Sequence, residues 1–387
     1  MLNDPNAPSV VRHPRSIVKI GGAVYACFAN PADNINAPMP MPGWIEWEVE
    51  NNSFFAADRF SVSFAVSALP DGRKEDWFVQ QEEITVEIFA GFPADPDNYD
   101  TGQLQSLIYG QADEVEFDPV RRVIHLSGRD LTGRMIDTKV TDVFVNRTTA
   151  DVARMMAAKY DLLPRITDSK IDFGKYYANN INAQLRSGSD WDVLCQAAHL
   201  AQFNVYVSGH ELHFEPPTDS NQPTYMLQWQ SDPFTFNGTH LHFTRSLILA
   251  AGARVTVRSA NQKTGKVAQG IYPQSAPSSA QQYTYKFANL NPEQAQARAE
   301  SLYKEIAQHE IKLRAELPAD LDISTQTVLQ VSGTGTIFDQ KYYPDAVTRR
   351  MSFHDGFTMS VTAKNMTDSN VYKLNAADMA VLKSAGA

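Results

Sequence analysis

The stretch Val120–Lys139, VRRVIHLSGRDLTGRMIDTK, lies where a β-rich first half of the chain gives way to a helical segment. Residues 123–127 alternate loosely between apolar and polar side chains, which predicts a β-strand. Gly128 is expected to end this strand. The adjacent charges of Arg129 and Asp130 then precede a turn into a new region. Taken alone, the stretch predicts that a sheet domain is followed by an α/β insert.

Two interpretations of Arg129 and Asp130 remain open. In the first, the two side chains form a local ion pair that closes the strand-to-helix turn, and Asp130 accepts backbone N–H bonds as aspartates do in turns. In the second, Arg129 bridges to another subunit, where its planar guanidinium gives a specific contact. Both roles are structural rather than catalytic.

The composition is that of a folded protein with more than one domain. The chain has 387 residues, of which 43% are hydrophobic and 20% are charged. At roughly 100 to 200 residues per domain, two to three domains are expected. The net charge of −10 and the absence of any lysine or arginine run predict no specific nucleic-acid binding.

The two cysteines and the N-terminus bear on the cellular compartment. Cys27 and Cys195 fit no metal-binding spacing. They are predicted to be buried thiols in a reducing compartment, with a disulfide as the alternative. The first residues lack the apolar core of a signal peptide, and no run of 18 apolar residues exists. We therefore expect no membrane insertion and synthesis in the cytoplasm.

Period-two patterns predict β domains at both ends of the chain. Residues 1–43 read as an N-terminal arm and a strand that lead into a first β domain at 44–145, where apolar and acidic residues alternate from Trp44 onward. A second, discontinuous β domain is predicted at 218–290 and 318–366. It closes with a hairpin at Asp355-Gly356.

Helical patterns lie between the two β domains and within the discontinuous second one. Residues 146–217 are predicted to form a small α/β insert with two helices, whose capping boxes are Thr148 with Asp151 and Ser189 with Asp192. Trp191 points inward on the second helix. Residues 291–317 are predicted to form one long helix, capped by Asn291 and Pro292, and residues 367–387 a C-terminal tail. The apolar stripe of the long helix is Leu302, Ile306, His309, Leu313 and Leu317.

The candidate catalytic and metal-binding residues give weak signals. His210 and His213 point to opposite faces of a predicted hairpin, and no third ligand accompanies His240 and His242. The glycines of residues 332–336 lack the lysine of a phosphate-binding loop, and no nucleophile-elbow motif is present. The scattered carboxylates leave a glycosidase-like pair open. We predict no catalytic, cofactor-binding or metal-binding residues.

Three segments, in this order and spacing, carry a resemblance to a known family. They are LSGRDLTGRMID, DWDVLCQAAHLAQFNVYV and YYPDAVTRRMSFHDGFTMSVTAKN. Together they resemble the baseplate hub proteins of contractile-tailed phages, which include the phage late control protein D group and Mu-like tail hubs, and which are related to the base of type VI secretion spikes. The resemblance covers about residues 44–365. The proline-rich N-terminal loop departs from it.

The resemblance implies a fold and a function. The fold is mainly β with an α/β insert, in which the two β domains are tube-type β-barrels. The implied function is a homotrimeric ring that joins a six-fold tail tube to a three-fold central spike in the virion. Other baseplate proteins and the tape measure protein are further partners. The residues expected to serve assembly are Gly128, Arg129, Asp130, Trp191, Ile306 and Leu313.

Two alternatives accompany this prediction. One is the base of a type VI secretion spike, which usually carries a spike domain on the same chain. The short tail after Asn365 favours a phage, pyocin or prophage hub with a separate spike. The other alternative is an enzyme, a tail-associated peptidoglycan hydrolase.

Overall fold

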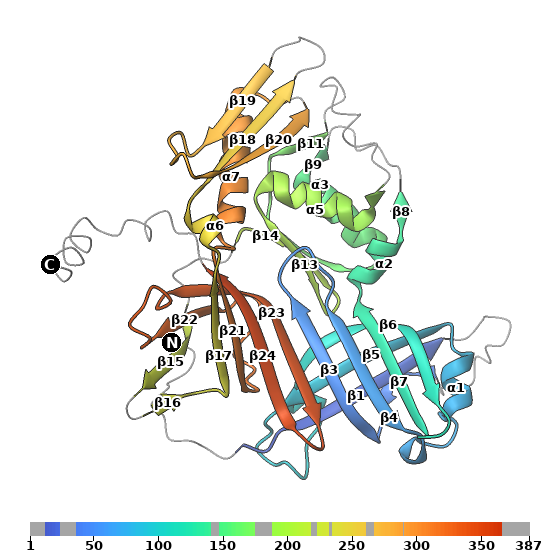
Figure 1. Cartoon of the computed structure of the whole chain (residues 1–387). Coiled ribbons are helices and arrows are strands. Elements are labelled where there is room, and N and C mark those ends of the chain that lie inside the picture. The colour runs from blue at the N-terminus through green and yellow to red at the C-terminus, as the bar shows by residue number, and fades with distance from the viewer. Residues whose placement is uncertain are drawn as a thin grey trace.

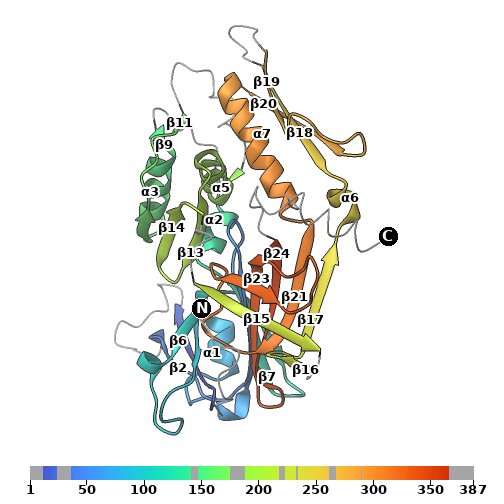
Figure 2. The ribbon, with the colours of Figure 1, turned by 90° about the vertical axis from the view of Figure 1, so that its left-hand side faces the viewer.

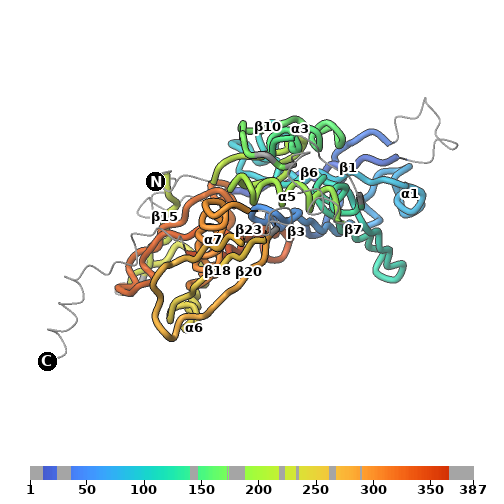
Figure 3. Tube along the Cα trace, turned by 90° about the horizontal axis from the view of Figure 1, so that it is seen from above, coloured from blue at the N-terminus to red at the C-terminus, as the bar shows by residue number. Residues whose placement is uncertain are grey.

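The computed structural model describes residues 12–23, 36–140, 147–174, 188–217, 223–231, 234–260, 267–288 and 290–365. Cys27 and the predicted C-terminal tail lie outside these ranges. The described residues form a large β body and two smaller α/β bodies, which lie next to each other at one end of it (Figures 1 and 3). No helix among the described residues is long and apolar enough to span a membrane.

The first half of the β body is an antiparallel sheet in the order β3–β4–β7–β6–β5–β1–β2. It includes a strand that precedes the first predicted β domain, and the short helix α1 follows β4. The elements are β1 (Arg15–Ala23), β2 (Met39–Pro40), β3 (Trp44–Asn52), β4 (Arg59–Ala65), α1 (Glu75–Gln80), β5 (Glu83–Gly91), β6 (Gln105–Asp118) and β7 (Val123–Asp130). Short 3-10 turns lie at Val66–Ala68 and Thr101–Gln103.

The second half follows the order β17–β21–β24–β23–β22–β15–β16. Its strands are β15 (Thr224–Ser231), β16 (Phe234–Phe236), β17 (His240–Arg245), β21 (Ile311–Pro318), β22 (Val328–Ser332), β23 (Lys341–Ser352) and β24 (Gly356–Asn365). All neighbours pair antiparallel except β15 and β22, which are parallel. The predicted hairpin at Asp355-Gly356 is confirmed, with Gly356 at φ 70° directly after its three-residue turn.

The two halves share one sheet and one hydrophobic core. Strand β23 pairs with β3 from Ala346 opposite Asn52 to Ser352 opposite Glu46. Trp47 of β3 and Val361 of β24, both at most 1% exposed, belong to the same buried cluster. The β halves therefore fold as one body.

The α/β insert follows β7 and has its own core (Figure 2). Its elements are α2 (Thr132–Asp137), β8 (Lys139–Val140), β9 (Arg147–Thr148), α3 (Thr149–Lys159), β10 (Leu163–Ile166), β11 (Asp172–Gly174), β12 (Gly188–Ser189), α5 (Asp190–Ala201), β13 (Asn204–Ser208) and β14 (Glu211–Glu215). Both predicted capping boxes are confirmed, because Thr148 and Ser189 each accept the N–H of the aspartate three residues on and the aspartate accepts theirs.

The second small body corrects the domain prediction. Strands β18 (Ala253–Ala260), β19 (Val267–Tyr272) and β20 (Gln281–Ala288) form a separate three-stranded sheet, which α7 (Pro292–Ala307) covers on one face. The four-residue helix α6 (Leu247–Ala250) precedes this sheet. Residues 253–288 are therefore not part of the second β domain.

The predicted long helix at 291–317 is wrong in its last part. Helix α7 ends at Ala307, and Ile311–Pro318 is strand β21. The physical reason is a shared periodicity, since Leu313 and Leu317 are four residues apart and fall on one face of either a helix or a strand. The cap at Asn291 is confirmed by its hydrogen bond from the Gln294 N–H.

A buried arginine lies where the two halves meet. Arg349 of β23 is 3% exposed. Its guanidinium donates to the Asn51 side chain at 3.2 Å and to the main-chain carbonyls of Asp320 and Ile323. Burial lowers the pKa of Arg349 to about 10. The neighbouring Arg350 instead points to the other face of the sheet and pairs with Glu48.

This pair of neighbours gives a matched test of the junction. Arg349→Leu leaves buried carbonyl groups without donors, so the free energy of unfolding should fall by roughly 2 to 4 kcal/mol. Arg350→Leu removes a half-exposed ion pair and should cost less than about 1 kcal/mol. Urea unfolding followed by circular dichroism measures both, and equal losses would contradict the assigned role of Arg349.

Candidate assembly surfaces

Eight strands of the β body form one continuous antiparallel array across the two halves. Their order is β17–β21–β24–β23–β3–β4–β7–β6. The beginning of β6 leaves the array and pairs with β5 instead of β7. The beginning of β23 stays paired with β24 and has β22 on its other side, where the rest of β23 has β3. The remaining strands of each half therefore form a second layer behind the array.

The two halves repeat the same strand order, with one difference in direction: β1 and β5 are antiparallel, whereas their counterparts β15 and β22 are parallel. In chain order, β1 to β7 correspond to β15, β16, β17, β21, β22, β23 and β24, and each half contributes four consecutive strands to the array. The α/β insert follows the first repeat, whereas the β18–α7 body interrupts the second repeat between β17 and β21. No similarity between the two β domains is visible in the sequence.

The two faces of the array differ in chemistry. Residues facing one another across six adjacent strands make an apolar row on the core side: Phe357, Met351, Trp47, Val62, Leu126 and Val115. The neighbouring row on the other face is polar: Thr358, Arg350, Glu48, Ser61, Ser127 and Glu114. Alternation along each strand thus gives the array one buried face and one polar face.

Both edges of the array are open in the described part of the chain. Strand β17 pairs only with β21, and residues 113–118 of β6 pair only with β7. The β6 edge has the acidic sequence DEVEFD, whereas the β17 edge, HLHFTR, carries two histidines and an arginine. Unpaired edge strands are templates for pairing with another chain. These edges are therefore candidate subunit contacts.

Gly128 does not end β7, which continues to Asp130. A Cβ at Gly128 would lie 2.0 Å from the carbonyl oxygen of Gln111 and 2.7 Å from the Cα of Ala112. The β6–β7 register shifts just beyond Ala112. Gly128 is therefore required where β6 passes unusually close to β7.

Arg129 forms ion pairs, but not with Asp130. Its guanidinium binds Asp113 of β6 at 2.7 Å and Asp137 of α2 at 2.7 Å. The hydrogen bonds that Arg129 donates to these two carboxylates raise its pKa. The predicted Arg129–Asp130 pair is therefore wrong, although Arg129 does join the end of β7 to its neighbours. Its contact with another subunit stays a prediction.

Asp130 is 6% exposed and closes the turn into α2. It accepts hydrogen bonds from the N–H and the hydroxyl of Thr132 at 3.1 and 3.0 Å, which confirms the predicted turn. Burial, and then the nearby carboxylate of Asp58, raise the pKa of Asp130 well above its ordinary value. Burial likewise raises the pKa of Asp58 to about 6.

The raised pKa of Asp130 predicts a dependence of stability on pH. Because its folded pKa exceeds its unfolded pKa, the contribution of Asp130 to stability is full below the unfolded value and is lost as pH rises through the folded value. In Asp130→Asn the amide oxygen accepts the Thr132 N–H as before, and the amide NH2 donates to the Thr132 hydroxyl in place of the bond that the second carboxylate oxygen accepted. The substitution should therefore raise the urea midpoint at pH 8, and the gain should vanish near pH 4.

Asp137→Asn is the control for that experiment. Arg129 lowers the pKa of Asp137, so this substitution should lower the urea midpoint at pH 8. If both substitutions shift the urea midpoint at pH 8 in the same direction, the opposite pKa shifts assigned to Asp130 and Asp137 are contradicted.

Trp191 faces inward as predicted and joins the insert to the β body. It is 4% exposed, and its indole N–H donates to the carbonyl of Phe55 at 3.1 Å. Phe55 lies in the β3–β4 loop at φ 74°, donates its N–H to Val205 of β13, and stacks on His199 of α5. These contacts position the insert over the end of β3.

Ile306 and Leu313 lie in different bodies, so the predicted common stripe is wrong. Leu313 is 1% exposed in β21 and contributes to the main core. Ile306 lies in the last turns of α7 and packs against the small β18–β20 core.

The separation of these residues predicts unequal effects of a buried charge. Leu313→Asp should abolish folding of the β body, because truncation alone at such a site costs about 2 to 5 kcal/mol. Ile306→Asp should loosen only the β18–α7 body and leave a cooperative unfolding transition. Circular dichroism and limited proteolysis distinguish the two outcomes, and a folded Leu313→Asp protein would contradict the burial of this side chain.

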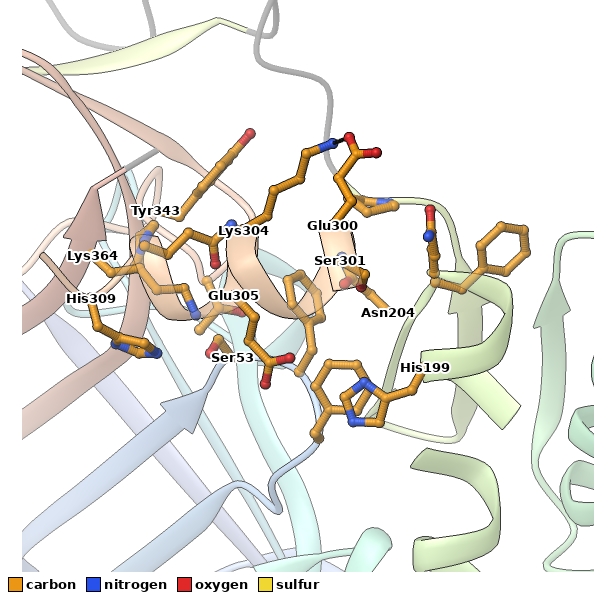
Figure 4. Close-up of a pocket in the computed structure, with 18 of the residues that line it drawn as sticks. Ser53, His199, Asn204, Glu300, Ser301, Lys304, Glu305, His309, Tyr343 and Lys364 are labelled. Atoms are coloured by element: carbon orange, nitrogen blue, oxygen red, sulfur yellow. Dashed lines mark ion pairs between the residues drawn. The ribbon is translucent and has the colours of Figure 1, made fainter. Parts of the chain in front are cut away.

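A cleft of about 650 Å³ lies where the three bodies meet. Residues of the β3–β4 loop, α5, α7 and the β23–β24 end line it, among them Ser53, His199, Lys304, His309 and Lys364 (Figure 4). Lys304 pairs with Glu300 at 2.9 Å. Burial lowers the pKa values of both His199 and His309. The cleft thus combines a few charges with aromatic walls at a joint between bodies.

The described residues contain no group of three His, Cys, Asp or Glu side chains that could hold a metal ion. His213 stacks on Tyr206, and His240 lies beside His242 with their rings 6.1 Å apart. Cys195 is a half-buried free thiol, whose pKa burial raises to about 12. His213 also lies 3.4 Å from a carboxylate oxygen of Glu211, and His242 lies 3.3 Å from the hydroxyl of Thr244.

The fold is that of phage tail proteins. The tail protein from Neisseria meningitidis MC58 superposes with a TM-score of 0.65 at 13% identity, over 90% of this chain and 96% of that chain. The 43 kDa tail protein of prophage MuSo2 from Shewanella oneidensis gives 0.60 at 12% identity, over 90% and 98%. These similarities confirm the fold that the resemblance implied.

A chain of a VgrG complex has a related fold. A chain of the Francisella PdpA-VgrG complex superposes with a TM-score of 0.51 at 9% identity, over 92% of this chain and 58% of that chain. At the level of sequence, no protein-family model matches the chain, and no curated protein matches it.

Proposed function

We propose that this protein is the structural hub of a phage tail baseplate, in which three copies close their arrays into one channel-forming ring. The observation that carries this proposal is the eight-stranded antiparallel array with an open edge at each end. A ring of copies pairs β17 of one chain with β6 of the next. This pairing satisfies the edge strands and hides them from aggregation.

The strand directions support closure. Because neighbours in the array are antiparallel and their number is even, β17 and β6 run in opposite directions. The strands on either side of each subunit seam therefore meet antiparallel, and the pattern continues around the ring without interruption. Cyclic symmetry thus closes the sheet with the same antiparallel backbone hydrogen bonding that joins the strands within each chain.

The number of copies follows from the resemblance to tail hubs. With two repeats per chain, three copies present six quasi-equivalent units to a six-fold tail tube, while the ring itself keeps the three-fold symmetry of a central spike. The polar face of the array lines the channel, through which the tape measure protein and DNA pass without specific binding. The protein acts in assembly rather than in turnover, within the virion tail, after synthesis in the host cytoplasm.

The base of a type VI secretion spike is the second candidate. The fold shared with a chain of the PdpA-VgrG complex favours it, and this chain spans 58% of that larger chain. In both candidates the ring and its seams are the same, and only the attachment of the spike differs.

Light scattering at several concentrations tests the ring. The expected native mass is about 129 kDa, three times the 43.1 kDa of one chain. Glu114→Lys with Glu116→Lys changes the formal charge of the β6 edge, DEVEFD, from −4 to 0 and should raise the dissociation constant of the trimer at least tenfold. Asp76→Lys with Glu82→Lys makes the same change in charge in and just after α1 and should leave the mass unchanged.

If the protein is a monomer at every concentration, its native mass is measured again after addition of the spike protein. A trimer that forms only with the spike agrees with the proposal. A protein that stays monomeric with the spike contradicts the hub function.

A further inference from the structure

Two hairpins at one rim of the β body each expose a large apolar side chain. Val120 at the β6–β7 turn is 91% exposed, and Phe353 at the β23–β24 turn is 80% exposed. Both turns lie at the end of the array opposite the two small bodies (Figure 1). The β23–β24 tip lies beside the start of β3, since Phe353 stacks on Trp44 with ring centroids 5.1 Å apart.

The two tips occupy equivalent places in the two repeats. Strand β6 corresponds to β23 and β7 to β24. In each case the first strand pairs at its start with a strand of the second layer, β5 or β22, and later turns back through the hairpin. Single exposed apolar residues are common on protein surfaces. Here each of two equivalent turns carries one, Val120 as the second of four turn residues and Phe353 as the first of three.

Both tips are also held in place by hydrogen bonds within their own turns. Asp118 accepts the N–H groups of Val120 and Arg121 at 2.9 Å. At the other tip, Ser352 accepts the N–H of Asp355 at 2.8 Å. The exposed side chains therefore project from fixed turns, as preorganised contact residues do.

We propose that Val120 and Phe353 are contact knobs for a six-fold ring, and that the rim carrying them faces the tail tube. The inference rests on the proposed trimer, in which these tips form six quasi-equivalent knobs, three of each kind. The partner it fits is a six-fold ring with an apolar socket at each of six positions. Six weak contacts made together give a firm attachment.

Symmetry also assigns the opposite end of the ring. There the α/β insert belongs to one repeat and the β18–α7 body to the other, so the two repeats are unlike at that end. In a trimer this end has only three-fold symmetry. It therefore matches a three-fold spike and not a six-fold tube.

The test uses the full-length trimer and two probes, tubes assembled from the tail-tube protein of the same particle and the purified spike protein. Val120→Ser and Phe353→Ser should each weaken co-sedimentation with tubes about tenfold, and the double variant should weaken it further. Trimer mass and spike binding should not change. The control is Leu247→Ser with Val267→Ser, which removes two side chains of similar exposure, 75% and 73%, from the β18–α7 body.

The outcomes separate this inference from the function on which it rests. If the double variant binds tubes as well as the control variant does, Val120 and Phe353 are not contact residues for the tube. Loss of spike binding instead of tube binding overturns the assigned direction of the ring. A wild-type protein that forms no trimer, even with the spike, overturns the hub function itself, and light scattering detects that before any tube is added.

Discussion

The ladder between β3 and β23 is the interaction on which the rest of the structure depends. It joins two separately curled halves into one array, and the groups on both faces of the sheet support it. On the core side Arg349 reaches Asn51 and the carbonyls of Asp320 and Ile323, while on the polar face Arg350 pairs with Glu48. An arginine without a carboxylate partner is rarely buried. Its hydrogen bond to Asn51 links β23 to β3 across the junction, and its bonds to the two carbonyl groups link β23 to the loop that follows β21.

That junction explains how a chain with two repeats can form a ring. Within each chain the second repeat meets the first through β23 and β3, and in the proposed ring the first repeat meets the next chain through β6 and β17. The two contacts correspond, because β6 is the counterpart of β23 and β17 is the counterpart of β3. The β3–β23 junction within one chain therefore corresponds to the proposed β6–β17 seam between two chains. The two contacts differ in charge, because only the seam places the acidic β6 edge opposite the histidines of β17.

Local signals in the sequence predicted local structure well. The capping boxes at Thr148 and Ser189 and the turn after Asp130 were predictable because each depends on residues that are close in the chain. The end of α7 was not, since the spacing of Leu313 and Leu317 suits both a helix and a strand. The role of Gly128 depends on the approach of β6, which local sequence does not reveal. The repeat was invisible because strand order carries no sequence signature.

The candidate assembly surfaces were predicted in kind but only partly in residues. Trp191 and Arg129 do lie at joints, although the partners of Arg129 come from β6 and α2 and not from its neighbour Asp130. The hairpin at Asp355-Gly356 was predicted, but the strands that form the open edges and the side chains exposed at the hairpin tips were not, since an edge is defined by what does not pair with it. Knowledge of the strand order is needed before either feature can be seen.

An electron cryomicroscopy reconstruction of the assembled ring shows directly whether the arrays of neighbouring chains pair. We expect a closed antiparallel barrel of 24 strands, eight from each of three chains, with β17 of one chain beside β6 of the next. The polar face should line its channel. Three arrays whose edges remain apart, or edges that pair with any other element, would contradict the account.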